Sequence, residues 1–100
     1  MNFFLMKRHT VTFKLKHPAN SPGETAFLQK AKTLAKLPTV RNFECLTQIS
    51  KKNNYDFGLS MEFANQSAYE AYNEHPDHVP FIQDIWIPEV TDFIEIDYAV

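Results

Sequence analysis

The sequence predicts an α+β domain with the element order β-α-β-β-α-β. Two segments, residues 9–16 and 55–63, alternate apolar and polar side chains with a period of two, which is typical of strands that are buried on one face. Two other segments, residues 22–37 and 66–73, place apolar residues three or four positions apart, as amphipathic helices do. Turn residues separate these segments, so each is predicted to be one element of a single fold.

The first strand and the first helix have clear boundaries. Residues 9–16 alternate strictly, and a proline soon afterwards ends the strand. Ser21 then suits the N-cap of a helix, and Glu24, three residues later, completes a capping box. An apolar stripe, with lysines in the last turns, continues this helix to about Leu37.

A hairpin of two strands is predicted in the middle of the chain. The second strand spans about residues 40–50 with a weak alternation, and the third spans residues 55–63 with a strict one. The polar run at residues 51–54 forms the turn between them. The expected inward side chains are Phe43, Cys45, Thr47 and Ile49 in the second strand and Tyr55, Phe57, Leu59, Met61 and Phe63 in the third.

A second helix, a short helical segment and a last strand complete the chain. The helix spans residues 66–73, and residues 79–86 form a helical turn that Pro88 closes. The last strand spans residues 93–98, and we expect its apolar side to meet the helices. The expected inward side chains are Ala68, Tyr69 and Tyr72 in the helix and Ile94, Ile96 and Tyr98 in the strand.

This order of elements predicts a ferredoxin-like fold, in which an antiparallel four-stranded sheet carries both helices on one face. The opposite face of the sheet is mostly polar, which favours a solvated face. A face covered by a second copy of the chain is the alternative. The side chains expected there are Thr10, Thr12, Lys14, Asn42, Glu44, Leu46, Ser60 and Glu62.

Length, composition and charge narrow the classes of partner. With 100 residues, 44% of them hydrophobic, the chain is predicted to form one domain, residues 1–100, whose core runs from about residue 8 to 98. The net charge of −2 gives no reason to expect nucleic acid. No apolar run approaches the ~20 residues that span a bilayer, so no membrane is expected. The run at residues 3–6 is too short for a signal-peptide core, so we expect a cytoplasmic protein.

The segment from Tyr72 to His78 is the best candidate for chemistry. It contains a phenol and two imidazoles. Imidazole titrates near physiological pH, and a neighbouring phenol can hold or donate a proton. His75 and His78 have no third ligand at a recognisable spacing, so no metal is expected. The sequence has no glycine-rich phosphate loop, and no cofactor is expected. We interpret His75 as a helix cap whose ring meets the last carbonyls of the helix.

Several short elements of the chain match a known family. They are His9-Thr10-Val11-Thr12-Phe13-Lys14, Leu37-Pro38-x-Val40, Phe63, Tyr72-x-x-His75-Pro76-x-His78 and Asp97-Tyr98. From about Arg8 to Tyr98 the chain resembles the Dabb family, the stress-responsive dimeric α/β-barrel proteins. The resemblance implies a homodimer in which two sheets pack face to face and close a barrel, with the helices outside. The mostly polar sheet face then becomes the expected dimer interface.

The resemblance also implies a site. One enzymatic member of the family, a plant cyclase, closes a linear polyketide by an aldol condensation, and its catalytic tyrosine and histidine match Tyr72 and His78. A histidine in its pocket matches His9, and a phenylalanine of its first helix matches Phe27. The chain departs from the cyclase at Phe57, where the enzyme has another pocket histidine, and at Lys30, where the enzyme has a pocket tyrosine on the first helix.

We therefore expect a small hydrophobic cavity between the helices and the sheet that binds a small hydrophobic or aromatic molecule. As an alternative, Tyr72 and His78 act as acid and base on a polyketide-like carbonyl substrate in a cofactor-free cyclase or lyase. A purely structural, stress-associated dimer is the third hypothesis. The expected polar groups of the cavity are His9, Tyr72 and His78, and its expected walls are Phe27, Phe57, Leu59 and Phe81.

Overall fold

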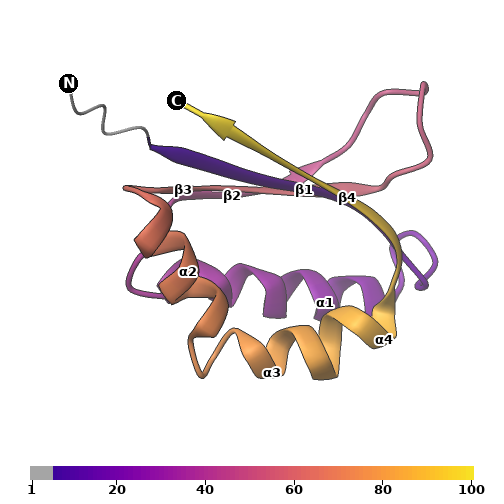
Figure 1. Cartoon of the computed structure of the whole chain (residues 1–100). Helices are drawn as coiled ribbons and strands as arrows, with labels where there is room; N and C mark the ends of the chain where they lie inside the picture. Colours follow the sequence, from indigo (N-terminus) through magenta and orange to yellow (C-terminus); the bar gives the residue numbers. More distant parts are fainter. Residues whose placement is uncertain (1–5) are drawn as a thin grey trace.

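The computed structural model describes residues 6–100 as one antiparallel sheet with the helices packed on one of its faces (Figure 1). The strand order is β2-β3-β1-β4, which confirms the predicted ferredoxin-like fold. The strands are β1 (Lys7–Leu15), β2 (Arg41–Thr47), β3 (Phe57–Phe63) and β4 (Val90–Ala99). The helical elements are α1 (Pro22–Lys32), η1 (Thr33–Lys36), α2 (Gln66–Glu74), α3 (Val79–Phe81), η2 (Ile82–Trp86) and α4 (Ile87–Glu89).

Two expectations concern how the chain meets a membrane. The apolar run at residues 3–6 is predicted to be too short for a signal-peptide core. Most of this run lies outside the described residues. Within residues 6–100, each helix is too short or too polar to cross a membrane.

β1 lies in the interior of the sheet, and its alternating side chains form the centre of the core. Val11, Phe13 and Leu15 face the helices and are buried, as the period of two predicts. The ring of Phe13 is fully buried, with its centroid 5.6 Å from that of Phe27 in α1 and 5.0 Å from that of Trp86 in η2. Burial of such rings stabilises the fold by about 25 cal/mol per Å² of apolar surface.

The predicted N-cap of α1, Ser21, is confirmed. The Ser21 hydroxyl accepts a hydrogen bond from the Glu24 N–H at 3.2 Å. The Glu24 carboxylate accepts from the N–H of Asn20, also at 3.2 Å, and not from that of Ser21, so the capping box is only half formed. After Lys32 the helix tightens into the 3₁₀ turn η1, so the α-helical part is shorter than predicted.

The hairpin between β2 and β3 has a longer loop than predicted. Pairing of the two strands ends near the hydrogen bond from the Gln48 N–H to the Asp56 carbonyl, at 2.9 Å. Beyond this pair the chain leaves the sheet, so β3 begins at Phe57 and not at Tyr55. Ile49 lies in the loop and is 89% exposed, so the prediction that it points inward is wrong.

The helical segment after α2 is longer than predicted and continues through Pro88 to Glu89. In the π-helical turn η2 the Ile87 N–H donates to the carbonyl of Ile82, five residues back. Proline has no N–H, and its ring crowds the carbonyl four residues before it. The wider π turn makes room for that ring, so Pro88 does not close the segment at residue 86 as predicted.

The side chains of β4 lie on the opposite faces of the sheet from those predicted. Its register with β1 pairs His9 with Asp97 and Val11 with Glu95, and side chains of paired residues lie on the same face of a sheet. Phe93, Glu95 and Asp97 therefore face the helices. The apolar side chains that were expected there lie on the outer face, each about half exposed; we call Ile94, Ile96 and Tyr98 the outer apolar strip.

The position of Phe13 gives a test of the core. Phe13→Ala should lower the free energy of unfolding by about 3–5 kcal/mol, because it leaves a cavity against Phe27 and Trp86. Ile49→Ala, at an exposed loop position, should change it by less than about 0.5 kcal/mol. Urea unfolding followed by circular dichroism measures both. Equal losses in the two variants would contradict this account of the core.

Candidate functional site

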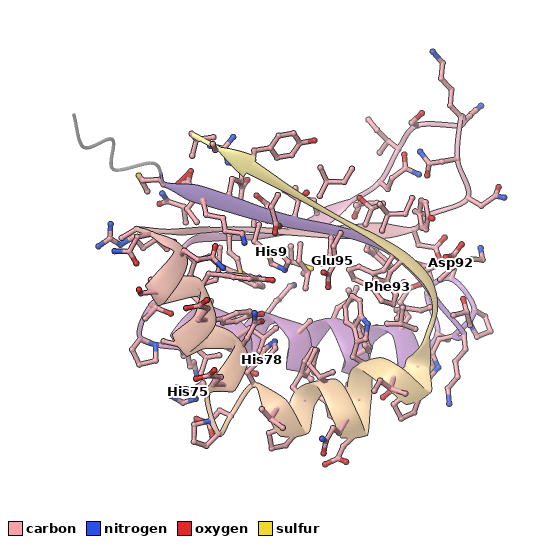
Figure 2. All side chains as sticks on the ribbon, in the orientation of Figure 1. His9, His75, His78, Asp92, Phe93 and Glu95 are labelled. Atoms are coloured by element: carbon pink, nitrogen blue, oxygen red, sulfur yellow. The ribbon has the colours of Figure 1, made fainter. Side chains whose placement is uncertain are left out.

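A cavity of about 380 Å³ lies between the inner face of the sheet and the helical segments that follow β3. Figure 2 shows His9 and Glu95 on the helix side of the sheet, facing the layer that carries His78. The polar lining residues are His9, Tyr69, Tyr72, Asn73, His78 and Glu95, and the apolar ones include Leu34, Leu59, Met61, Phe81, Trp86 and Phe93. A largely apolar wall with a few converging polar groups is typical of small-molecule sites.

Tyr72 is placed by the short helix α2. The side chain of Asn65 caps this helix by accepting a hydrogen bond from a first-turn N–H at 2.9 Å. The helix turns Tyr72 inward, where it is 4% exposed and its ring centroid lies 5.1 Å from that of Phe63. Burial raises the pKa of the Tyr72 phenol, and Tyr69 and Glu95 raise it further. The hydroxyl therefore stays protonated and can donate a hydrogen bond.

His78 lies directly beside Tyr72, with 4.2 Å between the ring centroids. Its Nδ1 is 3.1 Å from the carbonyl oxygen of Asn73, in the last turn of α2. A carbonyl only accepts, so Nδ1–H donates and the neutral ring keeps Nε2 as a free acceptor. Burial lowers the pKa of His78, and the bond to Asn73 opposes this shift without cancelling it. The ring is therefore a neutral base at physiological pH.

His9 enters the cavity wall from β1 and is held by a carboxylate. Its Nδ1 lies 2.6 Å from Oδ1 of Asp97, and the Lys7 ammonium lies 3.2 Å from Oδ2 of the same residue. Burial alone would raise the pKa of Asp97, but the hydrogen bonds from His9 and Lys7 outweigh it and hold this pKa below its usual range. Nδ1 of His9 therefore donates to a charged carboxylate, and this bond orients the imidazole in the cavity wall.

His75 takes no part in the cavity. Its Nδ1 accepts a hydrogen bond from the Asp77 N–H at 3.0 Å, and Figure 2 shows its side chain pointing away from the sheet. His75 is the C-cap residue of α2, as predicted, but the prediction that its ring meets the last carbonyls of the helix is wrong, because His78 makes that contact. Within residues 6–100, no three His, Cys, Asp or Glu side chains are grouped so that they could hold a metal ion.

The structure brings most of the predicted site residues together. His9, Leu59, Tyr72, His78 and Phe81 all line the cavity.

Phe27 and Phe57 do not line it, and this corrects the predicted wall. Phe27 is 1% exposed and is enclosed by Phe13 and Trp86, so no surface remains for a ligand. Phe57 opens the strand β3 and lies two residues before Leu59, toward the loop end of the sheet.

Three important residues of the site were missed. Phe93 and Glu95 line the cavity, and Asp97 holds His9. The sequence did contain a signal, because these residues alternate in β4 and Asp97 belongs to the shared family element Asp97-Tyr98. Taking Asp97 as an inward residue would have placed the other two on the same face.

Comparison with known proteins identifies the family. The sequence profile described as Stress responsive A/B Barrel Domain, Dabb, matches residues 8–100. The chain belongs to the Dabb family. The match covers the Tyr72–His78 segment and Asp97, and it confirms the resemblance seen in the sequence.

Solved structures agree with this assignment. A Dabb family protein with a ferredoxin-like fold from Mesorhizobium loti is 55% identical, with a TM-score of 0.94 over 96% of this chain and 97% of that one. A dimeric ferredoxin-like protein of unknown function from Thermobifida fusca is 21% identical (TM-score 0.80; 96% and 92% covered). The hydroxynitrile lyase from Passiflora edulis is 12% identical (TM-score 0.83; 95% and 93% covered). The last two show likeness of fold alone. No curated protein sequence matches the chain.

The environment of His78 predicts how stability depends on pH. The pKa of His78 is lowered in the folded state, so the unfolded chain binds more protons below its own pKa of about 6.5. The stability that the neutral ring contributes is therefore complete above that pH and is lost as the pH falls below it. We expect the difference in unfolding free energy between wild type and His78→Gln, measured in urea, to shrink from about pH 7.5 to about pH 5. A difference that is constant or grows on acidification would contradict the buried, neutral imidazole.

Proposed function

We propose that this Dabb protein binds a small, mostly apolar compound that carries a carbonyl group. The observation that supports this best is the Tyr72–His78 pair, whose rings lie 4.2 Å apart in the wall of a cavity of about 380 Å³. The protonated Tyr72 hydroxyl is a donor, and a carbonyl oxygen is the matching acceptor. The apolar wall, with Leu59, Trp86 and Phe93, suits the hydrocarbon or aromatic part of the same ligand.

The same pair favours acid–base catalysis as a second function. His78 offers Nε2 as a neutral base, because Nδ1–H is tied to Asn73 and burial keeps the pKa of the ring low. Nε2 would take a proton from the carbon next to the carbonyl, while Tyr72 donates a hydrogen bond to the developing enolate oxygen. The enolate would then add to a second carbonyl of the substrate, as in an aldol cyclisation, and the imidazolium would return the proton to the new alkoxide. No cofactor is needed for these steps.

We further propose that the chain forms a homodimer through the outer face of its sheet. The outer apolar strip, Ile94, Ile96 and Tyr98, exposes about half of each side chain, and such contiguous apolar surface is uncommon on a monomer. Leu46 adds a further exposed apolar side chain on β2 of the same face. Two such sheets packed face to face would bury these side chains. Structural neighbours described as dimeric lend support to this arrangement.

Ile96 offers a test of the interface. Ile96→Asp should convert a dimer into a monomer in light scattering at micromolar concentration, because a charge in the middle of the outer apolar strip would be buried without a partner. Ile49→Asp introduces the same charge in the exposed loop and should leave the assembly unchanged. A wild-type chain that is already monomeric, or an Ile96→Asp variant that remains dimeric, would overturn the proposed interface.

Tyr72 offers a test of ligand recognition. Acetophenone and α-methylstyrene have nearly the same shape, but only acetophenone has a carbonyl oxygen. Tyr72→Phe should weaken acetophenone binding by about tenfold, the effect of one lost hydrogen bond, and should leave α-methylstyrene binding unchanged. Shifts of amide NMR signals during titration measure both affinities, and Tyr55→Phe, at a tyrosine outside the cavity lining, is the control.

The contrary outcomes separate the three hypotheses for function. Binding of neither compound to the wild type would favour a purely structural dimer. Binding that Tyr72→Phe leaves unchanged would contradict the role of its hydroxyl. Turnover of a diketone by the wild type that is lost in His78→Ala, with fold and binding intact, would establish catalysis that depends on His78.

A further inference from the structure

Glu95 is an acidic side chain in an unusual position. The register of β4 with β1 places it opposite Val11 and on the helix side of the sheet, between two isoleucines that face outward. It lines the cavity together with Tyr72 and His78, and Figure 2 shows it below the sheet beside Phe93. It is also exposed, and β4 is an edge strand, so it stands where the cavity opens to solvent.

Within residues 6–100, the Glu95 carboxylate is not paired with a cation as the Asp97 carboxylate is. Asp97, two residues later on the same face, is paired with Lys7 and His9. Among residues 6–100, Glu95 enters no ion pair within 4.0 Å, and no lysine or arginine is among the described residues of the cavity wall. The carboxylate therefore remains available to whatever enters the cavity.

We propose that Glu95 determines ligand specificity: the cavity selects uncharged carbonyl compounds that carry a hydroxyl group, and it rejects carboxylates. This inference rests on the proposed function, because it names the substrate class of the same cavity. An ionised carboxylate has only acceptor positions, so its partner on the ligand has to be a donor. The apolar wall favours an uncharged donor, which is a hydroxyl. An anionic ligand would meet the Glu95 charge in a partly desolvated space with no lysine or arginine in its wall.

The electrostatic neighbourhood is consistent with this role. The main cause of the raised pKa of Tyr72 is burial, and the charge of Glu95 adds to it. The same charge opposes the lowering of the His78 pKa that burial causes. Glu95, Tyr72 and His78 line the same cavity, so a ligand there would also meet the field of this carboxylate.

A matched set of acetophenones tests the proposal. At about pH 7, 4′-hydroxyacetophenone and 3′-hydroxyacetophenone carry a hydroxyl donor, their methyl ethers carry none, and 4-acetylbenzoate carries a charge. The wild type should bind the better hydroxy compound at least about tenfold more tightly than its methyl ether or 4-acetylbenzoate. Glu95→Gln should bind 4-acetylbenzoate several-fold more tightly than the wild type does, and Glu95→Leu should lose the preference for the hydroxyl. Glu70→Gln removes the same charge from the exposed side of α2 and should behave as the wild type.

Each contrary outcome has a distinct meaning. Equal binding of all five compounds to the wild type, or identical behaviour of Glu95→Gln and Glu70→Gln, would overturn the role of Glu95 and leave the proposed carbonyl site intact. Absence of binding of every compound to the wild type and to both Glu95 variants at millimolar concentration would overturn the site and the specificity together.

Discussion

The pairing of β1 with β4 is the constraint on which the rest of the structure depends. The two strands come from opposite ends of the chain, and the residues that meet through His9 and Asp97 are 88 positions apart. A slip of one residue would move every side chain of β4 to the other face of the sheet. The observed register places Phe93, Glu95 and Asp97 on the helix side of the sheet and the isoleucines on its outer face. One pairing therefore sets both the polarity of the cavity and the apolar character of the outer face.

The cavity contains two imidazoles whose surroundings differ. His9 donates through Nδ1 to a carboxylate that a lysine also neutralises, whereas His78 donates to a neutral carbonyl and is packed against a phenol. In both rings the same nitrogen, Nε2, is left without its proton in the neutral form. The partners of Nδ1, a carboxylate on β4 for His9 and a main-chain carbonyl of α2 for His78, orient both rings before any ligand arrives. Preorganised groups of this kind lower the cost of ordering a site when a ligand binds.

The sequence predicted the order of elements and most of the site, because these depend on local periodicity and on short shared elements. Alternation in β1 and β3 was strong enough to give the core, and Tyr72, His78 and His9 meet as expected. The faces of β4 could not be predicted from apolarity, since that strand carries isoleucines on one side and two acidic residues on the other. Only long-range pairing decides between its faces. The passage of a helix through Pro88 likewise depends on a π turn that has no local signal.

The hydrogen bond at the end of α2 makes the orientation of His78 independent of the side chain at position 73. The acceptor for His78 is the main-chain carbonyl of Asn73, which every amino acid at that position would provide. Asn73 also belongs to the wall of the cavity, and its side chain has no share in that bond. During evolution, substitutions at position 73 can therefore change the cavity wall to suit another ligand, while the His78 imidazole keeps the same orientation and the same free nitrogen.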